Sequence, residues 1–507
     1  MRTGKSLSNN VIFNLILQIT VVCNGFIMPK LIMVNYGSDV NGMVSSISQF
    51  LSYITLLEAG IGGVIKSVLY KPLLQQDRYA LSGIVNATKR FFRTIGYIFI
   101  AYIAVIAVFY DKITVTGKDW WFSASLVLVI AITLLLEYFF GMTQQILLQA
   151  DQKFWLTSGV QIITLWVNIV LSVMLINLEC SIHVVKLSTA FIFSLRPICY
   201  NIYIKRHYKL DSKVPPNKGA LSQRWNGLGH HLAYFIHSNT DIALLTILTN
   251  TIEVSVYSVY LMIVTGVKYF FAAFSSAIEP YLGRIFATGD TNSLSKTFKV
   301  YEFAQYVVTT IIFSTTAVMI VPFVEVYTKG VTDGNYLRPL FAVLLVAAEG
   351  FYILRAPYSN IIFVAGHFKQ TQAGAFFEAG VNIALSLILI RPLGIVGVAV
   401  GTLIAMVFRT VNYALYVNKN IVNVGFWGLL RKLFAVVASY LIVYLTSTRM
   451  MISVDNYLSW CVYAAGTVMF AIFVTIFVYV ILDFKEVRYF YFFVKEGLEK
   501  RSRKEGR

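Results

Sequence analysis

The chain has 507 residues, of which 57% are hydrophobic, 15% aromatic and only 13% charged, and its mean hydropathy is +0.70. Soluble domains carry about 25% charged residues, so roughly half of the usual solvating surface is missing. This composition excludes a water-soluble enzyme of this length. A net charge of +18 would indicate nucleic acid binding in a soluble protein. In a membrane protein the position of the charge matters more than its sum, and we expect no nucleic acid partner.

Apolar segments separated by short polar breaks follow one another along the whole chain. Each is long enough for a transmembrane helix, which needs about 20 residues to cross the bilayer core. They predict an all-α polytopic membrane protein with about fourteen transmembrane helices. In chain order the predicted spans are residues 10–34, 40–70, 91–110, 121–150, 154–178, 181–204, 226–250, 254–286, 298–327, 336–366, 370–390, 393–418, 425–447 and 457–482.

The basic residues fix the expected orientation, because positive charge near the ends of spans is retained on the cytoplasmic side. With the N-terminus inside, 30 of the 42 Lys and Arg residues fall in cytoplasmic segments and six fall outside. Both termini are therefore predicted to be cytoplasmic, in the plasma membrane. The six remaining residues lie within spans and are Lys30, Lys186, Arg196, Lys268, Arg355 and Arg409.

An internal repeat divides the chain. Residues 167–176 and 381–390 are identical at seven of ten positions, 214 residues apart, and Arg196 with Tyr200 is matched by Arg409 with Tyr413, 213 residues apart. Because each repeat holds six spans, the two lobes have the same orientation, as in transporters with parallel repeats. The predicted segments are an N-terminal lobe (1–206), a cytoplasmic linker (207–224), a C-terminal lobe (225–420), an additional helix pair (421–484) and a basic cytoplasmic tail (485–507).

Ionisable residues at bilayer depth are costly and indicate function. Lys30, Lys186, Arg196 and Arg409 are near enough to span ends for their side chains to reach the interface, so anchoring is the simpler interpretation for these four. Lys268 and Arg355 lie near mid-span, and Pro357 predicts a break in the helix beside Arg355. The acidic residues near mid-span are Glu58, Glu137, Asp241, Glu349 and Glu378. Ion pairing between the lobes and ligand contact both remain open for this set.

Histidines and cysteines give weaker signals. His237 and Asp241 are four residues apart on one face of a predicted helix, a spacing that suits either a structural pair or a proton relay. No third or fourth ligand stands at a usual metal-binding distance, so no metal and no cofactor are expected. The four cysteines lie far apart and show no disulfide pattern.

Several weakly specific stretches carry a resemblance: residues 36–42 between the first two spans, residues 57–63, and residues 365–367 before the eleventh span. Together with two six-helix lobes and an additional pair, they resemble the multidrug/oligosaccharidyl-lipid/polysaccharide (MOP) exporter superfamily. The resemblance is specifically to its polysaccharide transporter branch, which includes Wzx-type flippases.

This resemblance implies a flippase, not an enzyme, that moves undecaprenyl-pyrophosphate-linked oligosaccharide repeat units from the inner to the outer leaflet of a bacterial cytoplasmic membrane by alternating access. The implied partners are that substrate, membrane lipids, and a polysaccharide polymerase or glycosyltransferases of the same pathway. The surface polymer, a capsule or an O-antigen, is left open. Basic lumen residues hold the pyrophosphate in relatives, and the matching candidates here are Lys30, Lys268, Arg355, Arg196 and Arg409. Candidates for coupling to H⁺ or Na⁺ are Glu58, Asp241, His237 and Glu349.

Two alternatives remain. A cation-coupled multidrug and toxin extruder of the same superfamily is favoured by the acidic majority near mid-span. A membrane polysaccharide polymerase is disfavoured, because the outer loops are short and lack the paired acids that such chemistry requires.

Overall fold

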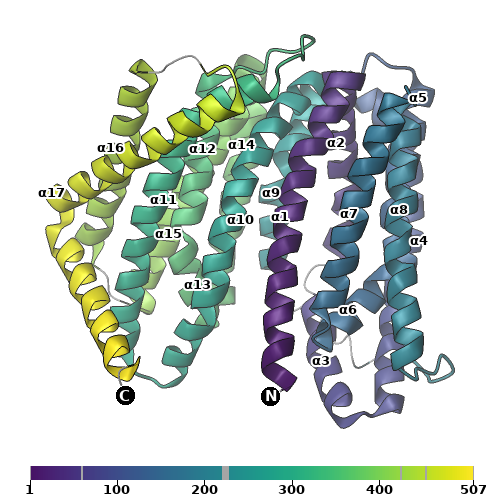
Figure 1. The fold of residues 1–507 in the computed structure, drawn as a ribbon, viewed down its shortest axis with the longest axis horizontal. Helices are drawn as coiled ribbons and strands as arrows, with labels where there is room; N and C mark the ends of the chain where they lie inside the picture. The colour runs from purple at the N-terminus through teal and green to yellow at the C-terminus, as the bar shows by residue number, and fades with distance from the viewer. Residues whose placement is uncertain are drawn as a thin grey trace. The chain divides into compact units, whose positions relative to one another are not determined.

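The computed structural model describes residues 2–58, 61–217, 219, 228–422, 425–450 and 454–505, and all regular elements in this part of the chain are helices. The chain forms two compact units (Figure 1). The first unit, residues 1–258 with 330–334, holds α1 (Arg2–Tyr36), α2 (Ser38–Ser52), a 3₁₀ helix (Tyr53–Glu58), α3 (Ile61–Gln75), α4 (Arg78–Ile113), α5 (Trp120–Leu136), a π-helical turn (Glu137–Gly141), α6 (Met142–Ala150), α7 (Phe154–Asn177), α8 (Ile182–His207), α9 (Leu228–Leu248) and the start of α10 (Thr251–Ala287). The second unit holds the rest of α10, then α11 (Thr291–Tyr327), α12 (Pro339–Leu354), α13 (Ala356–Val364), α14 (Phe368–Leu393), α15 (Ile395–Asn420), α16 (Phe426–Arg449) and α17 (Tyr457–Glu505).

The predicted spans correspond to these helices. Within the described residues, twelve helices are long and apolar enough to cross a membrane, counting α5 with α6 and α12 with α13 as single spans. A thirteenth is the pair Ser38–Glu58 and Ile61–Gln75, which is bent by 45°. The remaining predicted span, 226–250, corresponds to α9, whose described apolar part is the short segment Asn239–Leu248. The expectation of an all-helical membrane protein with about fourteen spans is thus confirmed. The lobe boundaries stay a prediction, and residues 218 and 220–224 of the predicted linker lie outside the described residues.

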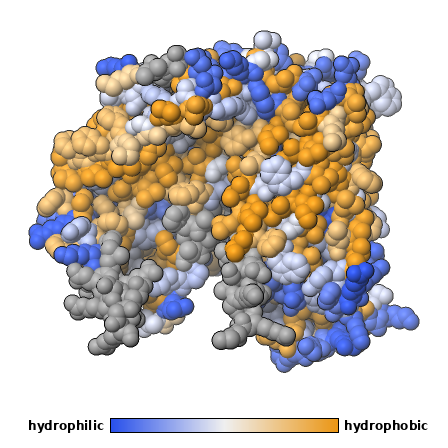
Figure 2. Space-filling view, viewed as in Figure 1, coloured by the Kyte–Doolittle hydropathy of each residue, from blue (hydrophilic) through white to orange (hydrophobic). Residues whose placement is uncertain are grey.

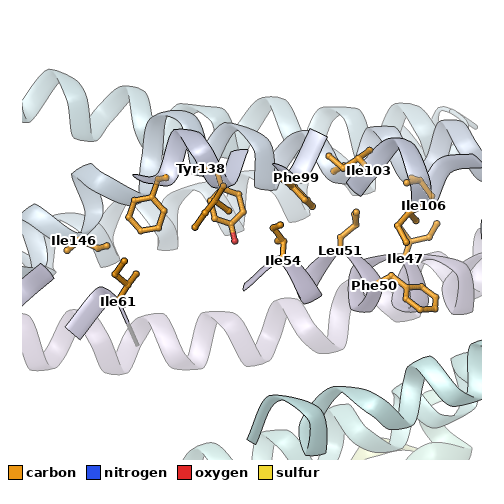
Figure 3. Packing of buried hydrophobic residues seen from close by; sticks show 14 of the residues in the cluster. Ile47, Phe50, Leu51, Ile54, Ile61, Phe99, Ile103, Ile106, Tyr138 and Ile146 are labelled. Atoms are coloured by element: carbon orange, nitrogen blue, oxygen red, sulfur yellow. The ribbon is translucent and has the colours of Figure 1, made fainter. Parts of the chain in front are cut away.

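The first unit is held by an apolar core between α2, α4 and the α5–α6 span. Figure 3 shows Ile47 and Leu51 of α2 facing Ile103 and Phe99 of α4, with Tyr138 of the π-helical turn beside them. These side chains are almost fully buried. Since lipid offers no hydrophobic driving force between helices, such packing stabilises the bundle through close contact.

The junction of α1 and α2 is tied to distant segments of the same unit. Gly37 adopts a φ of +91°, which favours glycine, and the next residue, Ser38, donates its backbone N–H and its hydroxyl to Asp333, each at 2.6 Å. One turn later, Asn41 Nδ2 donates to Ser255 Oγ at 2.8 Å. Asn41 and Ser255 are 214 residues apart, which is the offset of the repeat. Residues at equivalent positions of the two repeats therefore contact each other.

The second unit is built around α11 and α15. α14 packs on α15, α15 on α12, and α11 contacts both α12 and the additional helices α16 and α17. α17 is broken at Asp483, whose φ of −142° and ψ of 47° are not helical. In Figure 1 this break separates the two yellow segments of α17.

Apolar side chains cover the flanks of the helices. Figure 2 shows hydrophobic residues over the middle of the bundle and hydrophilic residues at helix ends. On α7 and α8, for example, Ile163 and Phe191 are 64% and 69% exposed. Exposed apolar side chains at this density are expected where helices face lipid.

Candidate functional site

The tenth span is interrupted at Arg355. α12 ends one residue before Arg355 and α13 begins one residue after it. Pro357 has no backbone N–H, so the carbonyl group of Ile353, four residues earlier, loses its helical donor. The Gln305 side chain of α11 supplies another, with Nε2 3.5 Å from that carbonyl oxygen. The predicted break is confirmed, and a neighbouring helix satisfies the backbone group that it frees.

Two arginines share one carboxylate in the second unit. Arg355 Nη1 donates to Glu378 Oε1 at 2.6 Å, and Arg409 Nε lies 3.4 Å from Oε2 of the same side chain. Arg409 also donates to the Thr371 carbonyl oxygen at 3.1 Å and to the Tyr413 hydroxyl at 2.8 Å. Its side chain is only 2% exposed. The interpretation that Arg409 anchors at the membrane surface is therefore wrong, because the guanidinium is turned into the protein.

A second ion pair lies next to the first. Lys268 Nζ of α10 donates to Glu349 Oε2 of α12 at 2.9 Å. The ring centroid of Tyr352 is 4.9 Å from Lys268 Nζ and 4.4 Å from Arg355 Cζ, so one aromatic ring contacts both cations. Such cation–π contacts contribute about 0.5 to 2 kcal/mol each. We call this set the cationic cluster: Lys268, Glu349, Tyr352, Arg355, Glu378 and Arg409.

The balance of charge in the cationic cluster is positive. Three cations face two carboxylates, which leaves one positive charge without a countercharge inside the cluster. Among its charged side chains, Lys268 is the most exposed, at 27%. Arginine and lysine bind phosphate oxygens well, arginine through two parallel hydrogen bonds and lysine as a point charge. Lys268 is therefore the cation of the cluster that is most open to a ligand.

Arg196 occupies the equivalent position in the first unit. Its Nε donates to Thr164 Oγ1 at 2.8 Å, and its Nη1 lies 3.8 Å from Glu137 Oε1. Thr164 precedes Glu378 by 214 residues, which is the offset of the repeat. In each unit, the Nε atom of the arginine therefore points at the side chain in the same position of the repeat. The partner is a hydroxyl in the first unit and a carboxylate in the second.

The other predicted substrate and coupling residues belong to the first unit, except Glu349, which is part of the cationic cluster. Lys30 is half-buried on α1, in the first unit. Glu58 accepts a hydrogen bond from the Tyr138 hydroxyl at 3.2 Å, and Asp241 accepts one from the Tyr257 hydroxyl at 2.8 Å. Glu349 is the partner of Lys268, while the side chain of His237 lies outside the described residues. Within those residues, no group of three or more potential metal ligands is found.

Sequence reasoning missed one buried ion pair, between α11 and α16. Lys432 Nζ donates to Glu302 Oε2 at 2.7 Å, and each side chain is 1% exposed. The Tyr358 hydroxyl donates to the other oxygen of Glu302 and lies 2.9 Å from the Tyr306 hydroxyl. Lys432 is absent from the six basic residues that the sequence analysis placed within spans, which was wrong, because its ammonium is inside the protein. The available signal was its position, seven residues inside the predicted span 425–447.

Comparison with known proteins finds solved structures with a similar fold. No family model and no curated protein matches the chain. Among solved structures, the lipid II flippase MurJ in an inward closed conformation is similar, with a TM-score of 0.69 and 12% identity over 93% of this chain and 98% of that one. An inward-facing multidrug resistance MATE family transporter of the MOP superfamily has a TM-score of 0.61 and 12% identity over 80% and 98%. A eukaryotic MATE transporter has 0.56 and 15% over 83% and 96%. At these identities, what is shared is the fold.

Proposed function

We propose that this chain is a flippase that moves undecaprenyl-pyrophosphate-linked oligosaccharide repeat units from the inner to the outer leaflet of a bacterial cytoplasmic membrane, for cell-surface polysaccharide biosynthesis. A headgroup of sugars and phosphates cannot cross about 30 Å of hydrocarbon unaided, so the carrier must offer it a polar site that opens to each side in turn. Both termini are cytoplasmic in this proposal.

The observation that carries the proposal is the charge of the cationic cluster. An anionic diphosphate needs a site with more positive than negative groups, and Lys268, Arg355 and Arg409 outnumber Glu349 and Glu378. In the sequence, the acidic majority near mid-span favoured a cation-coupled multidrug extruder instead. In the second unit, however, both acids of that set are bound to cations, so they do not form a free anionic site.

The extent of the structural likeness gives further support. The MurJ structure covers 93% of this chain, whereas the two MATE structures cover 80% and 83%. Residues 421–507, with the additional helices α16 and α17, make up 87 of the 507 residues. Coverage of 93% requires that most of this segment be matched, as expected for a carrier of a lipid-linked substrate.

Coupling to H⁺ or Na⁺ is the second part of the proposal. Glu58 is a carboxylate that makes no ion pair among the described residues and accepts a hydrogen bond from Tyr138. Such a group can take up a proton or a cation at low cost. The same feature would serve a cation-coupled multidrug extruder, which is therefore the second candidate function.

The decisive experiment compares a deletion strain with the same strain carrying wild-type or variant genes. We expect the deletion to accumulate lipid-linked oligosaccharide at the inner leaflet, with Lys268→Ala and Arg355→Ala restoring little export although the proteins reach the membrane at normal levels. Lys369→Ala, which removes an exposed lysine on α14, is the matched control and should restore export. Unaltered polysaccharide export together with new drug sensitivity would exclude the flippase and favour the extruder.

A further inference from the structure

A polar pocket lies between the start of α11 and the segment of α17 that follows the break at Asp483. Its volume is about 450 Å³. α11 contributes Ser295, Lys296 and Lys299, and α17 contributes Lys485, Glu486 and Tyr489. We call it the lysine pocket. All of these residues belong to the second unit, and none belongs to the cationic cluster.

The lysine pocket carries more positive charge than its own groups neutralise. Three lysines face one carboxylate, that of Glu486. Lys296 and Lys299 are three residues apart and therefore project from the same face of α11. None of the three lysines has a carboxylate oxygen within 4.0 Å among the described residues. Within the described residues, the pocket therefore concentrates positive charge that no ion pair compensates.

The two helices that form the pocket pack against each other through aromatic side chains. Phe490 of α17 contacts Phe303 of α11, with ring centroids 5.3 Å apart, and Phe303 in turn contacts Tyr479 at 5.6 Å. These contacts hold α17 against α11 on both sides of the break at Asp483. The lysines are thus presented on a fixed surface between two helices, unlike the lysines of a free tail.

The same segment of α17 also carries aromatic side chains that are exposed. Phe484, Tyr491 and Phe492 are 58%, 62% and 51% exposed, and Arg488 lies over the Phe492 ring at 5.5 Å. Aromatic rings alternating with basic residues are typical of helices at the level of lipid headgroups. The predicted topology puts this end of α11 and α17 on the cytoplasmic side.

We propose that the lysine pocket binds the phosphate headgroup of an anionic phospholipid of the inner leaflet. Basic pockets between transmembrane helices on the cytoplasmic side bind such headgroups, and each lysine near an anionic membrane surface contributes about fivefold in affinity. The occupant is a lipid, not a soluble anion, because the exposed aromatic rings beside the pocket provide contacts for acyl chains. By occupying the pocket, the lipid bridges α11 and the end of α17.

Native mass spectrometry of the full-length protein in detergent tests this site, with phosphatidylglycerol and phosphatidylcholine as probes. We expect wild-type protein to retain phosphatidylglycerol in preference to phosphatidylcholine, and K296Q/K299Q/K485Q to lose at least about tenfold in affinity for phosphatidylglycerol. The matched control is K71Q/K369Q/K419Q, which removes the same charge at exposed positions outside the pocket and should leave the affinity within about twofold. If the triple variant does not fold, K485Q alone should lose about fivefold.

Two outcomes would overturn the proposal. Equal losses in the pocket and control variants would show that only the general positive charge attracts the lipid. Displacement of phosphatidylglycerol by millimolar inorganic phosphate or pyrophosphate would show that the pocket prefers a soluble anion. Neither outcome bears on the flippase proposal, because export by K296Q/K299Q/K485Q is measured separately in the deletion strain.

Discussion

Arg409 directs its Nε at Glu378 Oε2 across 3.4 Å. The repeat-equivalent nitrogen, Arg196 Nε, donates to the neutral hydroxyl of Thr164 at 2.8 Å instead. One geometry is thus kept in both units, while the partner's charge differs. Glu378 also accepts a hydrogen bond from Arg355 at 2.6 Å. In the second unit, the arginine of the repeat therefore shares its partner with a second cation, and the first unit has no cation at the equivalent position.

Glu378 should be essential for stability. In Glu378→Ala two buried guanidinium groups lose their common countercharge, and breaking a buried pair in this way costs about 3 to 5 kcal/mol. We expect a clearly lower midpoint of thermal unfolding for the purified protein in detergent. Glu325→Ala, at an exposed position of α11, should change the free energy of unfolding by no more than about 0.5 kcal/mol. Similar midpoints for the two variants would contradict the assigned role.

Charge reversal separates ion pairing from substrate binding at Lys268. Lys268→Glu and Glu349→Lys should each lower the amount of folded protein in the membrane, because each puts two like charges at a distance now 2.9 Å. The double variant restores an ion pair and should recover the protein level, but not export, if Lys268 binds the substrate anion. Immunoblots of membranes and accumulation of lipid-linked oligosaccharide are the two measurements. Recovery of export by the double variant would make the pair purely structural.

The pair formed by Lys432 and Glu302 should behave as a unit. Lys432→Met leaves the Glu302 carboxylate buried without its cation and should destabilise the protein by about 3 to 5 kcal/mol. Adding Glu302→Gln removes the unpaired charge and should recover most of that loss, because a neutral buried pair avoids the cost of desolvation. Thermal unfolding of the single and double variants is the test, with the exposed Lys419→Met as the control. Additive losses in the double variant would refute the coupling.

Two glycines of the second span should respond oppositely to alanine. A Cβ at Gly42 would lie 1.7 Å from the Thr251 carbonyl oxygen, whereas a Cβ at Gly63 would meet no atom within 4 Å. Gly42→Ala should therefore destabilise the protein by about 1 to 3 kcal/mol or more through overpacking. Gly63→Ala should be neutral, or stabilise by up to about 1 kcal/mol, because alanine favours a helix. Thermal unfolding midpoints in the reverse order would contradict this contact.

The predicted membrane topology can be tested without a transport assay. Protease cleavage sites added at either terminus should be protected in intact cells and cut in inverted vesicles, because fourteen spans return the chain to its starting side. A site placed after Lys118, in a predicted outer loop, is the positive control and should be cut from outside. Cleavage of one terminus in intact cells would change the span count by an odd number.

Local patterns were sufficient to predict the helices but not their partners. Apolar length predicts a span, and a proline predicts a break, so the spans and the interruption at Arg355 could be read along the chain. Ion pairs join residues far apart, as between Glu302 and Lys432, 130 positions away from each other. The acidic majority near mid-span was therefore visible, whereas its neutralisation by Arg355 and Lys268 was not.

The separation of Glu302 and Lys432 along the chain also bears on biosynthesis. At about 5 to 20 residues per second, a ribosome delivers Lys432 roughly 7 to 26 s after Glu302. Throughout that delay the Glu302 carboxylate lacks the cation that Lys432 supplies in the folded protein. Synthesis of α16 then supplies this cation, and we expect nascent chains that stop before residue 432 to be preferred targets of quality-control proteases.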